Sequence, residues 1–317
     1  MYYLGIDLGG TNIAAAVVDD SYQIIGRGKV KTRCPRPAEE IAADMFAASM
    51  SAVEAAGLTL DDIYSVGVGA PGTINQESGV IEFSNNLGFH NVPLIEMLEQ
   101  HFGRKVYMEN DANAAAYGEF LAGAGKTAKD FVAITLGTGV GSGIILDGRI
   151  FSGTNFAGGE IGHTVMVNDG ELCTCGRKGC WEAYASATAL IHQTREAMSA
   201  HKDSKMWEIS GGLEKVNGLT AFDAMRAGDA AGIEVTKRYI EYIACGLVNV
   251  INIFQPEIVC IGGGISAEGE TLLAPIRQYV EQYRYSRYSK KQTEIKKAEL
   301  GNDAGIIGAA CLYKLHE

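Results

Sequence analysis

Short apolar runs alternate along this chain with glycine-rich turns and with longer segments of helical spacing. The apolar runs at 4–8 and 13–18 flank a Gly-Gly-Thr-Asn turn, a pattern that predicts a β-hairpin. Residues 22–30 predict a third strand, and residues 39–57 predict a helix that ends at Gly57. Further strands are expected at 63–68, 106–108, 131–136, 142–146 and 258–261, and further helices at 94–103, 111–122, 233–254 and 304–315.

The strand-rich openings near residues 1 and 131 each lead into helices, which predicts an α/β fold with two lobes. The segment 6–11 can be laid on 134–139, so that Gly9 falls on Gly137, 128 positions later. Both copies run from a strand through a Gly/Thr turn into a second strand, which indicates an internal repeat. Chance similarity between two glycine hairpins remains an alternative at this point.

Length and charge narrow the class of protein. The chain has 317 residues, enough for two domains, and 40 of them are glycine, which favours many tight turns. Its formal net charge of −11 argues against nucleic acid and against anionic membranes as partners. The N-terminus does not resemble a signal peptide and no apolar run is long enough to cross a membrane, so we expect a cytoplasmic protein.

Three of the seven cysteines are clustered. Cys173, Cys175 and Cys180 form a C-x-C-x₄-C pattern, a spacing typical of metal ligands, and His163 is the nearest candidate for a fourth ligand. Four protein ligands would leave no open position, so the pattern predicts a structural zinc ion. The isolated cysteines are expected to be small buried hydrophobic residues: Cys34, Cys245, Cys260 and Cys311.

Two glycine hairpins of this kind suit a polyphosphate, because glycine lets backbone N–H groups approach phosphate oxygens. Asp7, directly before the first turn, indicates a cation between the carboxylate and the phosphate. Plain tight turns are the alternative. The segment 262–264, three glycines after a strand, is a third candidate nucleotide contact.

Polar residues gather where a strand is expected to end and a helix to begin, at 109–113. Ligand binding and capping of the following alanine-rich helix by Asn110 or Asp111 are both open. A zinc-bound loop would also bring Glu160 and Glu182 near His163, where the carboxylates would suit sugar hydroxyls. For Glu182 the alternative is a favourable charge in the first turn of a helix.

Together these segments resemble the ROK family of bacterial sugar kinases over nearly the whole chain. The motifs that carry the resemblance are DLGGTN at 7–12, ENDAN at 109–113, LGTG at 136–139, GEIGH at 159–163, the Cys cluster with Trp181-Glu182, and IGGG at 261–264. The resemblance implies a two-lobed actin-like/hexokinase ATPase fold of duplicated ribonuclease H-like domains with a cleft between the lobes. The expected smaller lobe comprises 1–120 with 301–317, and the larger lobe 121–300 with a zinc-binding loop at 163–180.

The resemblance also implies residue roles. Asp111 matches the catalytic base, and Asp7 is expected to order Mg²⁺. The sugar ligands would be Asn86, Asn110, Asp111, Glu160, His163 and Glu182. The ATP-binding residues would be Asp7, Gly9, Gly10, Thr11, Asn12, Gly137, Thr138, Gly139, Gly263 and Gly264. The zinc ligands would be His163, Cys173, Cys175 and Cys180, with His163 using one ring nitrogen for zinc and the other for sugar.

The implied activity is transfer of the γ-phosphoryl group of ATP to the 6-OH of a hexose, with glucose as the expected substrate and a homodimer or homotetramer as the expected assembly. Fructose, mannose, allose, N-acetylmannosamine and N-acetylglucosamine remain alternative substrates. A non-catalytic sugar-sensing protein of the same family and a chaperone-like ATPase are rival functions. A repressor of this family would need a helix-turn-helix before the sugar domain, and the first expected strand begins too early, near Tyr3, for that.

Overall fold

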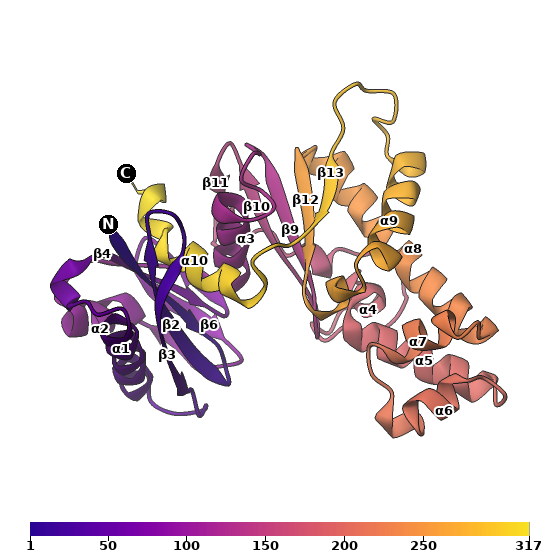
Figure 1. Ribbon diagram of the computed structural model, residues 1–317, viewed down its shortest axis with the longest axis horizontal. Helices are drawn as coiled ribbons and strands as arrows, with labels where there is room; N and C mark the ends of the chain where they lie inside the picture. The colour runs from indigo at the N-terminus through magenta and orange to yellow at the C-terminus, as the bar shows by residue number, and fades with distance from the viewer. Residues whose placement is uncertain (317) are drawn as a thin grey trace. The chain divides into compact units, whose positions relative to one another are not determined.

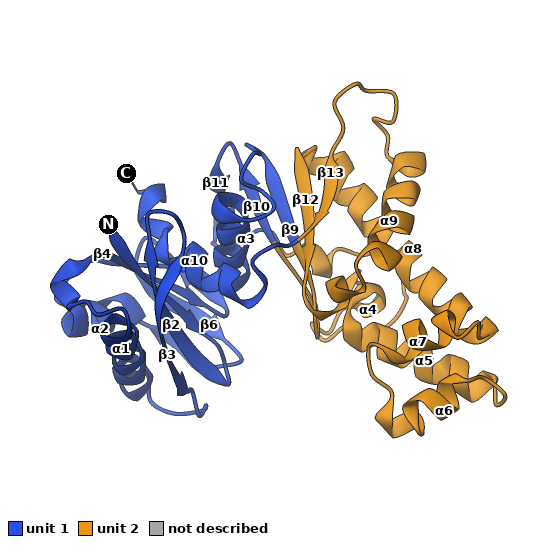
Figure 2. Ribbon diagram, in the orientation of Figure 1, with its two compact units in different colours: residues 1–133, 143–159, 298–317 blue, residues 134–142, 160–297 orange. Residues whose placement is uncertain are grey.

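The computed structural model describes residues 1–316, and Glu317, the last residue of the predicted 301–317 segment, lies outside them. The chain divides into two compact units (Figures 1 and 2). Unit 1 comprises residues 1–133, 143–159 and 298–317, and unit 2 comprises 134–142 and 160–297. The predicted lobe boundaries at residues 120 and 300 stay a prediction.

Unit 1 is built on a five-stranded sheet of order β3-β2-β1-β4-β8. The predicted hairpin is confirmed: β1 (Tyr2–Leu8) and β2 (Asn12–Asp19) pair antiparallel, and β3 (Ile24–Lys31) continues the meander. Strands β4 (Ile63–Ala70) and β8 (Val106–Asn110) run parallel to β1. Their ends therefore meet at the same edge of the sheet.

Side chains of β1 point alternately to the two faces of the sheet, and each face is covered by different helices. Leu4, Ile6 and Leu8 are fully buried in one core with α1 (Ala38–Ala55) and α2 (Leu94–Phe102). Gly5 faces the other side, where a β-carbon would lie 2.0 Å from the carbonyl oxygen of Ile306 in α10 (Ala304–Ala310). Glycine is needed there because the backbone of α10 lies directly on the sheet.

The internal repeat is confirmed by a second five-stranded sheet, of order β11-β10-β9-β12-β13. In both sheets the first three strands along the chain form a meander, and the fourth and fifth strands follow on the other side of the first strand. Strand β9 (Phe131–Leu136) ends 128 positions after β1, and β10 (Val140–Leu146) begins 128 positions after β2. The sheet is completed by β11 (Arg149–Ile150), β12 (Ile258–Gly262) and β13 (Glu294–Lys297).

Several elements were not foreseen from the sequence. A three-stranded sheet is formed by β5 (Thr73–Asn75), β6 (Val80–Ser84) and β7 (Phe89–Val92). Besides α1 and α2, two further helices follow the prediction, α3 (Asp111–Ala122) and α8 (Ala230–Phe254). Apart from α10, the remaining helices are α4 (Glu182–Ala185), α5 (Ala187–Ala200), α6 (Met206–Ser210), α7 (Thr220–Arg226) and α9 (Glu270–Tyr283). The predicted helix at 304–315 is wrong in its length, because the chain leaves the α conformation at Cys311 and continues as a 3₁₀ turn at 312–315.

Among the helices of residues 1–316, none combines the length and the apolar composition that crossing a membrane requires.

Candidate active site

Asn110 ends β8 and caps α3. Its side-chain Oδ1 accepts hydrogen bonds from the backbone N–H groups of Ala112 (2.9 Å) and Asn113 (3.2 Å), and its Nδ2 donates to the carbonyl of Gly72 (3.1 Å). Of the two interpretations left open by the sequence, helix capping by Asn110 is therefore confirmed. A contact with sugar stays a prediction.

Asp111, the predicted base, is the first residue of α3. One carboxylate oxygen, Oδ1, accepts from the N–H of Ala112 at 2.9 Å, and burial raises the pKa of the carboxyl group above its ordinary value. Burial also raises the pKa of Asp7 to about 6, with a smaller contribution from the negative charge of Asp111. Unit 1 therefore holds two mostly buried carboxylates close enough to repel each other, an arrangement that suits proton transfer or a divalent cation.

The first glycine turn follows Asp7. Its backbone is closed by a hydrogen bond from the N–H of Gly9 to the carbonyl of Asn12 at 3.0 Å. The Oδ1 atom of Asn12 is buried and has no hydrogen-bond partner within residues 1–316. A β-carbon on Gly10 would lie 3.5 Å from the carbonyl oxygen of Asn86, so the structure brings the predicted sugar residue Asn86 beside this turn. Thr11 is exposed at the tip.

The second glycine turn, 137–139, lies in unit 2 and is supported by α5. The N–H of Ala187 donates to the carbonyl of Gly137 at 2.8 Å, and the hydroxyl of Thr188 donates to the carbonyl of Thr138 at 2.8 Å. Gly263 packs on the end of β9, where its β-carbon would lie 2.3 Å from the carbonyl oxygen of Leu136. The predicted ATP-binding residues Gly263 and Gly264 therefore follow β12, which is the neighbour of β9 in the sheet.

The predicted zinc ligands converge. The ligand atoms of His163, Cys173, Cys175 and Cys180 all lie within 4.8 Å of one another. The Nδ1 atom of His163 is 3.6 Å from Sγ of Cys173, and the sulfurs of Cys175 and Cys180 are 3.7 Å apart, too far for a disulfide. Zn–S bonds of about 2.3 Å and Zn–N bonds of about 2.0 Å produce tetrahedron edges of about 3.5–3.8 Å. The donor set and two of its separations therefore fit zinc.

Glu182 connects this cysteine cluster to the second glycine turn. Its Oε2 accepts from the N–H of Val140 at 3.0 Å, while Oε1 accepts from the hydroxyl of Thr174 at 2.8 Å and lies 3.5 Å from Sγ of Cys173. Sequence spacing did not show these bonds, because they depend on how the loop folds back. Glu160 is exposed and immediately precedes the 3₁₀ turn 161–163.

Glu109 is a polar residue of this region to which the sequence analysis assigned no role. Its side chain is only 3% exposed, and it accepts hydrogen bonds from the N–H of Asn110 and from Nδ2 of Asn113. The sequence analysis singled out the segment Glu109-Asn110-Asp111, but nothing in the sequence distinguished a buried glutamate from an exposed one.

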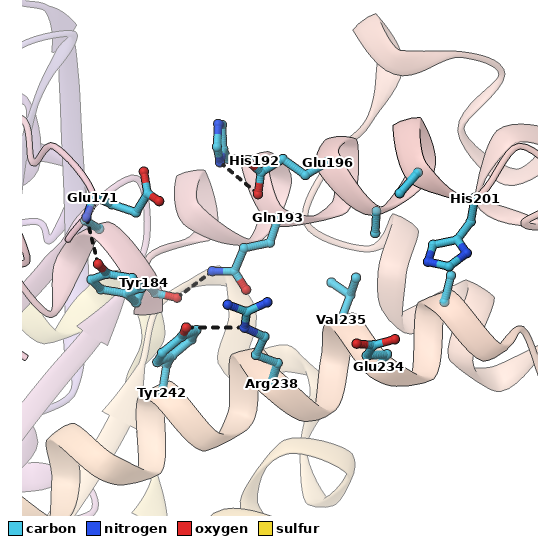
Figure 3. A pocket seen from close by; sticks show the side chains of 14 residues that line it. Glu171, Tyr184, His192, Gln193, Glu196, His201, Glu234, Val235, Arg238 and Tyr242 are labelled. Atoms are coloured by element: carbon cyan, nitrogen blue, oxygen red, sulfur yellow. Dashed lines mark hydrogen bonds and ion pairs between the residues drawn. The ribbon is translucent and has the colours of Figure 1, made fainter. Parts of the chain in front are cut away.

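A cavity of about 280 Å³ lies between α5 and α8 in unit 2 (Figure 3). Its walls include Arg238, whose Nε donates to the Tyr242 hydroxyl at 3.2 Å, and Gln193, whose Nε2 donates to the Tyr184 carbonyl at 2.9 Å. These polar groups bind one another across the wall. None of the predicted sugar, nucleotide or zinc residues lines this cavity.

Comparison with known proteins shows which class of protein this chain belongs to. A sequence model of the ROK family matches residues 3–316. The glucokinase of Halalkalibacterium halodurans is 38% identical over 320 residues, covering 100% of this chain and 96% of the relative. The glucokinase of Thermotoga maritima is 36% identical over 312 residues, covering 98% and 96%.

Among solved structures, a ROK family glucokinase from Streptomyces griseus in complex with glucose and AMPPNP has a TM-score of 0.80 at 36% identity, covering 98% of this chain and 99% of that one. The duplicated sheets and this likeness define a protein of the actin-like ATPase fold. Within that fold, the chain belongs to the ROK family.

Proposed function

We propose that this protein is an ATP-dependent glucokinase, which transfers the γ-phosphoryl group of ATP to the 6-OH of glucose. Two full-length relatives named glucokinase and the glucose complex of a similar structure support this activity. The observation that carries the proposal is Asp111, a mostly buried carboxylate at the start of α3 whose pKa is raised by burial. A raised pKa makes it a stronger base than an exposed aspartate.

Asp111 accepts the proton of the 6-OH while that oxygen forms a bond to the γ-phosphorus. The bond from the γ-phosphorus to the bridging oxygen breaks, so the products are ADP and the sugar 6-phosphate. The transferred group needs little covalent help, because phosphoryl transfer depends mainly on position and charge neutralisation. A general base contributes about 10²–10⁴-fold to the rate.

The sugar ligands in this proposal come from both units. Asn86, Asn110 and Asp111 belong to unit 1, whereas Glu160, His163 and Glu182 belong to unit 2. His163 would use Nε2 for a sugar hydroxyl, since its Nδ1 faces Cys173.

The nucleotide is assigned to the two glycine turns and to the glycines after β12. The residues are Gly9, Gly10, Thr11, Asn12, Gly137, Thr138, Gly139, Gly263 and Gly264. In both turns the backbone is held by its own hydrogen bonds, which leaves little conformational entropy to lose when phosphate binds.

Asp7 and Asn12 would hold a magnesium ion through its water ligands. Buried carboxylates that repel each other and an unpartnered buried acceptor suit hydrated Mg²⁺, which prefers oxygen ligands and keeps several waters. When bound, Mg²⁺ supplies positive charge to the phosphates. His163 and the three cysteines would hold zinc in a purely structural role, since four protein ligands leave no position for substrate.

The test is phosphorylation of a panel of hexoses with ATP and Mg²⁺ by the wild-type chain and by Asp111→Asn. We expect glucose to have the highest kcat/KM, and Asp111→Asn to lose about 10²–10⁴-fold in kcat. Asp303→Asn is the control, because Asp303 is a partly exposed carboxylate of the same unit that pairs with Arg27. Near-normal turnover by Asp111→Asn would contradict the assignment.

The same panel separates the alternatives. Higher kcat/KM for fructose, mannose, allose or an N-acetylhexosamine would replace glucose as the substrate. Sugar binding without phosphorylation would indicate a non-catalytic sensor, and ATP hydrolysis independent of sugar would indicate a chaperone-like ATPase. A cytoplasmic homodimer or homotetramer that binds neither nucleic acid nor membranes completes the proposal, and light scattering of the purified protein tests the assembly.

A further inference from the structure

Glu109 is a buried carboxylate surrounded by uncharged donors. Its Oε1 accepts from the N–H of Asn110 at 2.8 Å and from Nδ2 of Asn113 at 3.0 Å. Its Oε2 accepts from Nε2 of Gln76 and, at 3.5 Å, from the hydroxyl of Ser152. An ionised carboxylate can accept from all of these groups, because it has acceptor sites on both oxygens and no hydrogen of its own.

A glutamine at this position would satisfy the same donors poorly. Its carbonyl oxygen would replace one carboxylate oxygen, but its NH₂ group would point at other N–H or O–H donors. Burying a charge is also an expensive way to stabilise a fold, since burial raises the pKa of Glu109 against the effect of its hydrogen bonds. Stability by itself therefore gives a weak reason for a carboxylate here.

The donors lie on both sides of Asp111 in the chain. The N–H of Asn110 belongs to the residue before Asp111, and Asn113 lies in the first turn of α3 after it. Gln76 follows β5 and Ser152 follows β11, so one carboxylate connects two other segments of unit 1 to the start of α3. The Glu109 side chain thus adds to the Asn110 cap in holding the backbone on both sides of Asp111.

The side chains around the Glu109 carboxylate are not tightly packed. A cavity of about 150 Å³ is lined by Glu109, Gln76 and Ser152, together with Arg149 and residues of the C-terminal turn. If the carboxylate were lost, the side chains around it would have room to move, and the start of α3 could shift with them. Shifts of about 1 Å at a reacting group can cost about 10²-fold in rate.

We infer that Glu109 is a positioning residue of the phosphoryl transfer: through the N–H of Asn110 and the amide of Asn113 it holds Asp111 in line with the sugar hydroxyl. The inference rests on the proposed function, because it assigns to Glu109 a role in that reaction. Glu109 itself touches neither sugar nor nucleotide in this role.

Glu119 provides a matched control on the same helix. It too is 3% exposed, and its carboxylate accepts backbone N–H groups of Ala124 (3.0 Å), Glu299 (3.0 Å) and Leu300 (2.7 Å). These donors are at the far end of α3 from Asp111. Glu119→Gln should therefore cost stability in the way that Glu109→Gln does, without moving the base.

The experiment compares Glu109→Gln and Glu119→Gln with the wild type at a temperature well below their melting temperatures. We expect Glu109→Gln to lower kcat about 10–100-fold while KM for ATP changes less than about 3-fold. Hydrogen exchange of the Ala112 and Asn113 amides should accelerate only in Glu109→Gln. In Glu119→Gln, kcat should stay within about 2-fold of wild type, while exchange accelerates at Ala124.

A folded Glu109→Gln with kcat within about 2-fold of wild type would overturn the inference, as would an equal loss of kcat in Glu119→Gln. These outcomes leave the proposed function intact. A wild-type chain that phosphorylates no hexose would instead overturn the proposed function, and the positioning role with it.

Discussion

Asp7, at the end of β1, and Asp111, at the start of α3, are close enough for the charge of one to affect ionisation of the other. The pKa of Asp7 rises to about 6, mainly because the side chain is buried and in smaller part because Asp111 is negative. Two segments more than a hundred residues apart in sequence thus bring like charges together. Such a pair is costly for folding and useful for binding a metal ion.

Asp7→Asn should stabilise the nucleotide-free protein and impair its activity. The folded-state pKa of about 6 lies above the ordinary value of 3.8, so the ionised carboxylate destabilises the folded state. This cost is absent below about pH 3.8, grows between pH 3.8 and about 6, and is complete above that range. We expect the variant to gain about 1–3 kcal/mol in free energy of unfolding at pH 7.5 and almost nothing at pH 4.

Urea denaturation across this pH range measures the gain, and initial rates with MgATP measure the loss of activity, which we expect to reach about 10²-fold. Asp303→Asn is the control, because the Arg27 ion pair lowers the pKa of Asp303 and its loss cannot stabilise the protein. A variant that is less stable than the wild type at pH 7.5 would show that Asp7 is not an unfavourable buried charge.

Zinc should be present at about one ion per chain, and its removal should destabilise unit 2. Cys175→Ser is the informative variant, because Cys175 is exposed and its sulfur makes little apolar packing that serine would lose. We expect the variant to lose most of its zinc and several kcal/mol of stability, since the free energy of binding a structural metal contributes to folding.

Elemental analysis and thermal melts with and without a chelator measure both effects. Cys34→Ser is the control, because Cys34 lies apart from the cluster and should leave the zinc content unchanged. Full zinc content in Cys175→Ser, or an unchanged melt after zinc removal, would contradict a structural site.

Gly139→Ala should displace Glu182 and weaken sugar binding. A β-carbon on Gly139 would lie 2.3 Å from Oε2 of Glu182, far inside van der Waals contact, so the carboxylate that accepts from Val140 must move. We expect KM for glucose to rise about 10-fold or more, because a sugar hydroxyl would lose a charged acceptor.

Gly137→Ala is the matched control in the same turn, since a β-carbon there meets nothing within 4 Å. Steady-state kinetics at varied glucose and fixed saturating ATP separate the two variants. An equal rise in KM for both would assign the effect to the turn itself and not to Glu182.

Local sequence patterns predicted much of the fold and many candidate residues. Glycine turns between apolar runs predicted both hairpins, and the offset of 128 residues between them predicted an internal repeat, which the two sheets of matching strand order confirm. The C-x-C-x₄-C spacing with His163 predicted a cluster that the folded chain brings within 4.8 Å. These features are local, or repeat a local pattern, and so can be read from neighbouring residues.

Features that depend on distant contacts were missed. The sheet β5-β6-β7 consists of short strands with little periodicity, and the helix expected at 304–315 breaks at Cys311 where the segment packs under β1 and β4. The role of Asn110 as a cap, left open by the sequence, was decided by the direction of its side chain toward the N–H groups of α3.

The sequence by itself determined the α/β class, the duplicated hairpins and the residue types of the candidate site, because these follow from periodicity, turn chemistry and ligand spacing. Only the tertiary structure decided that Glu109 is buried among hydrogen-bond donors and that Glu182 accepts a hydrogen bond from the N–H of Val140. It also decided that the negative charge of Asp111 raises the pKa of Asp7. The physical reason is that burial and electrostatic coupling depend on which segments meet in space, and spacing along one chain does not specify that.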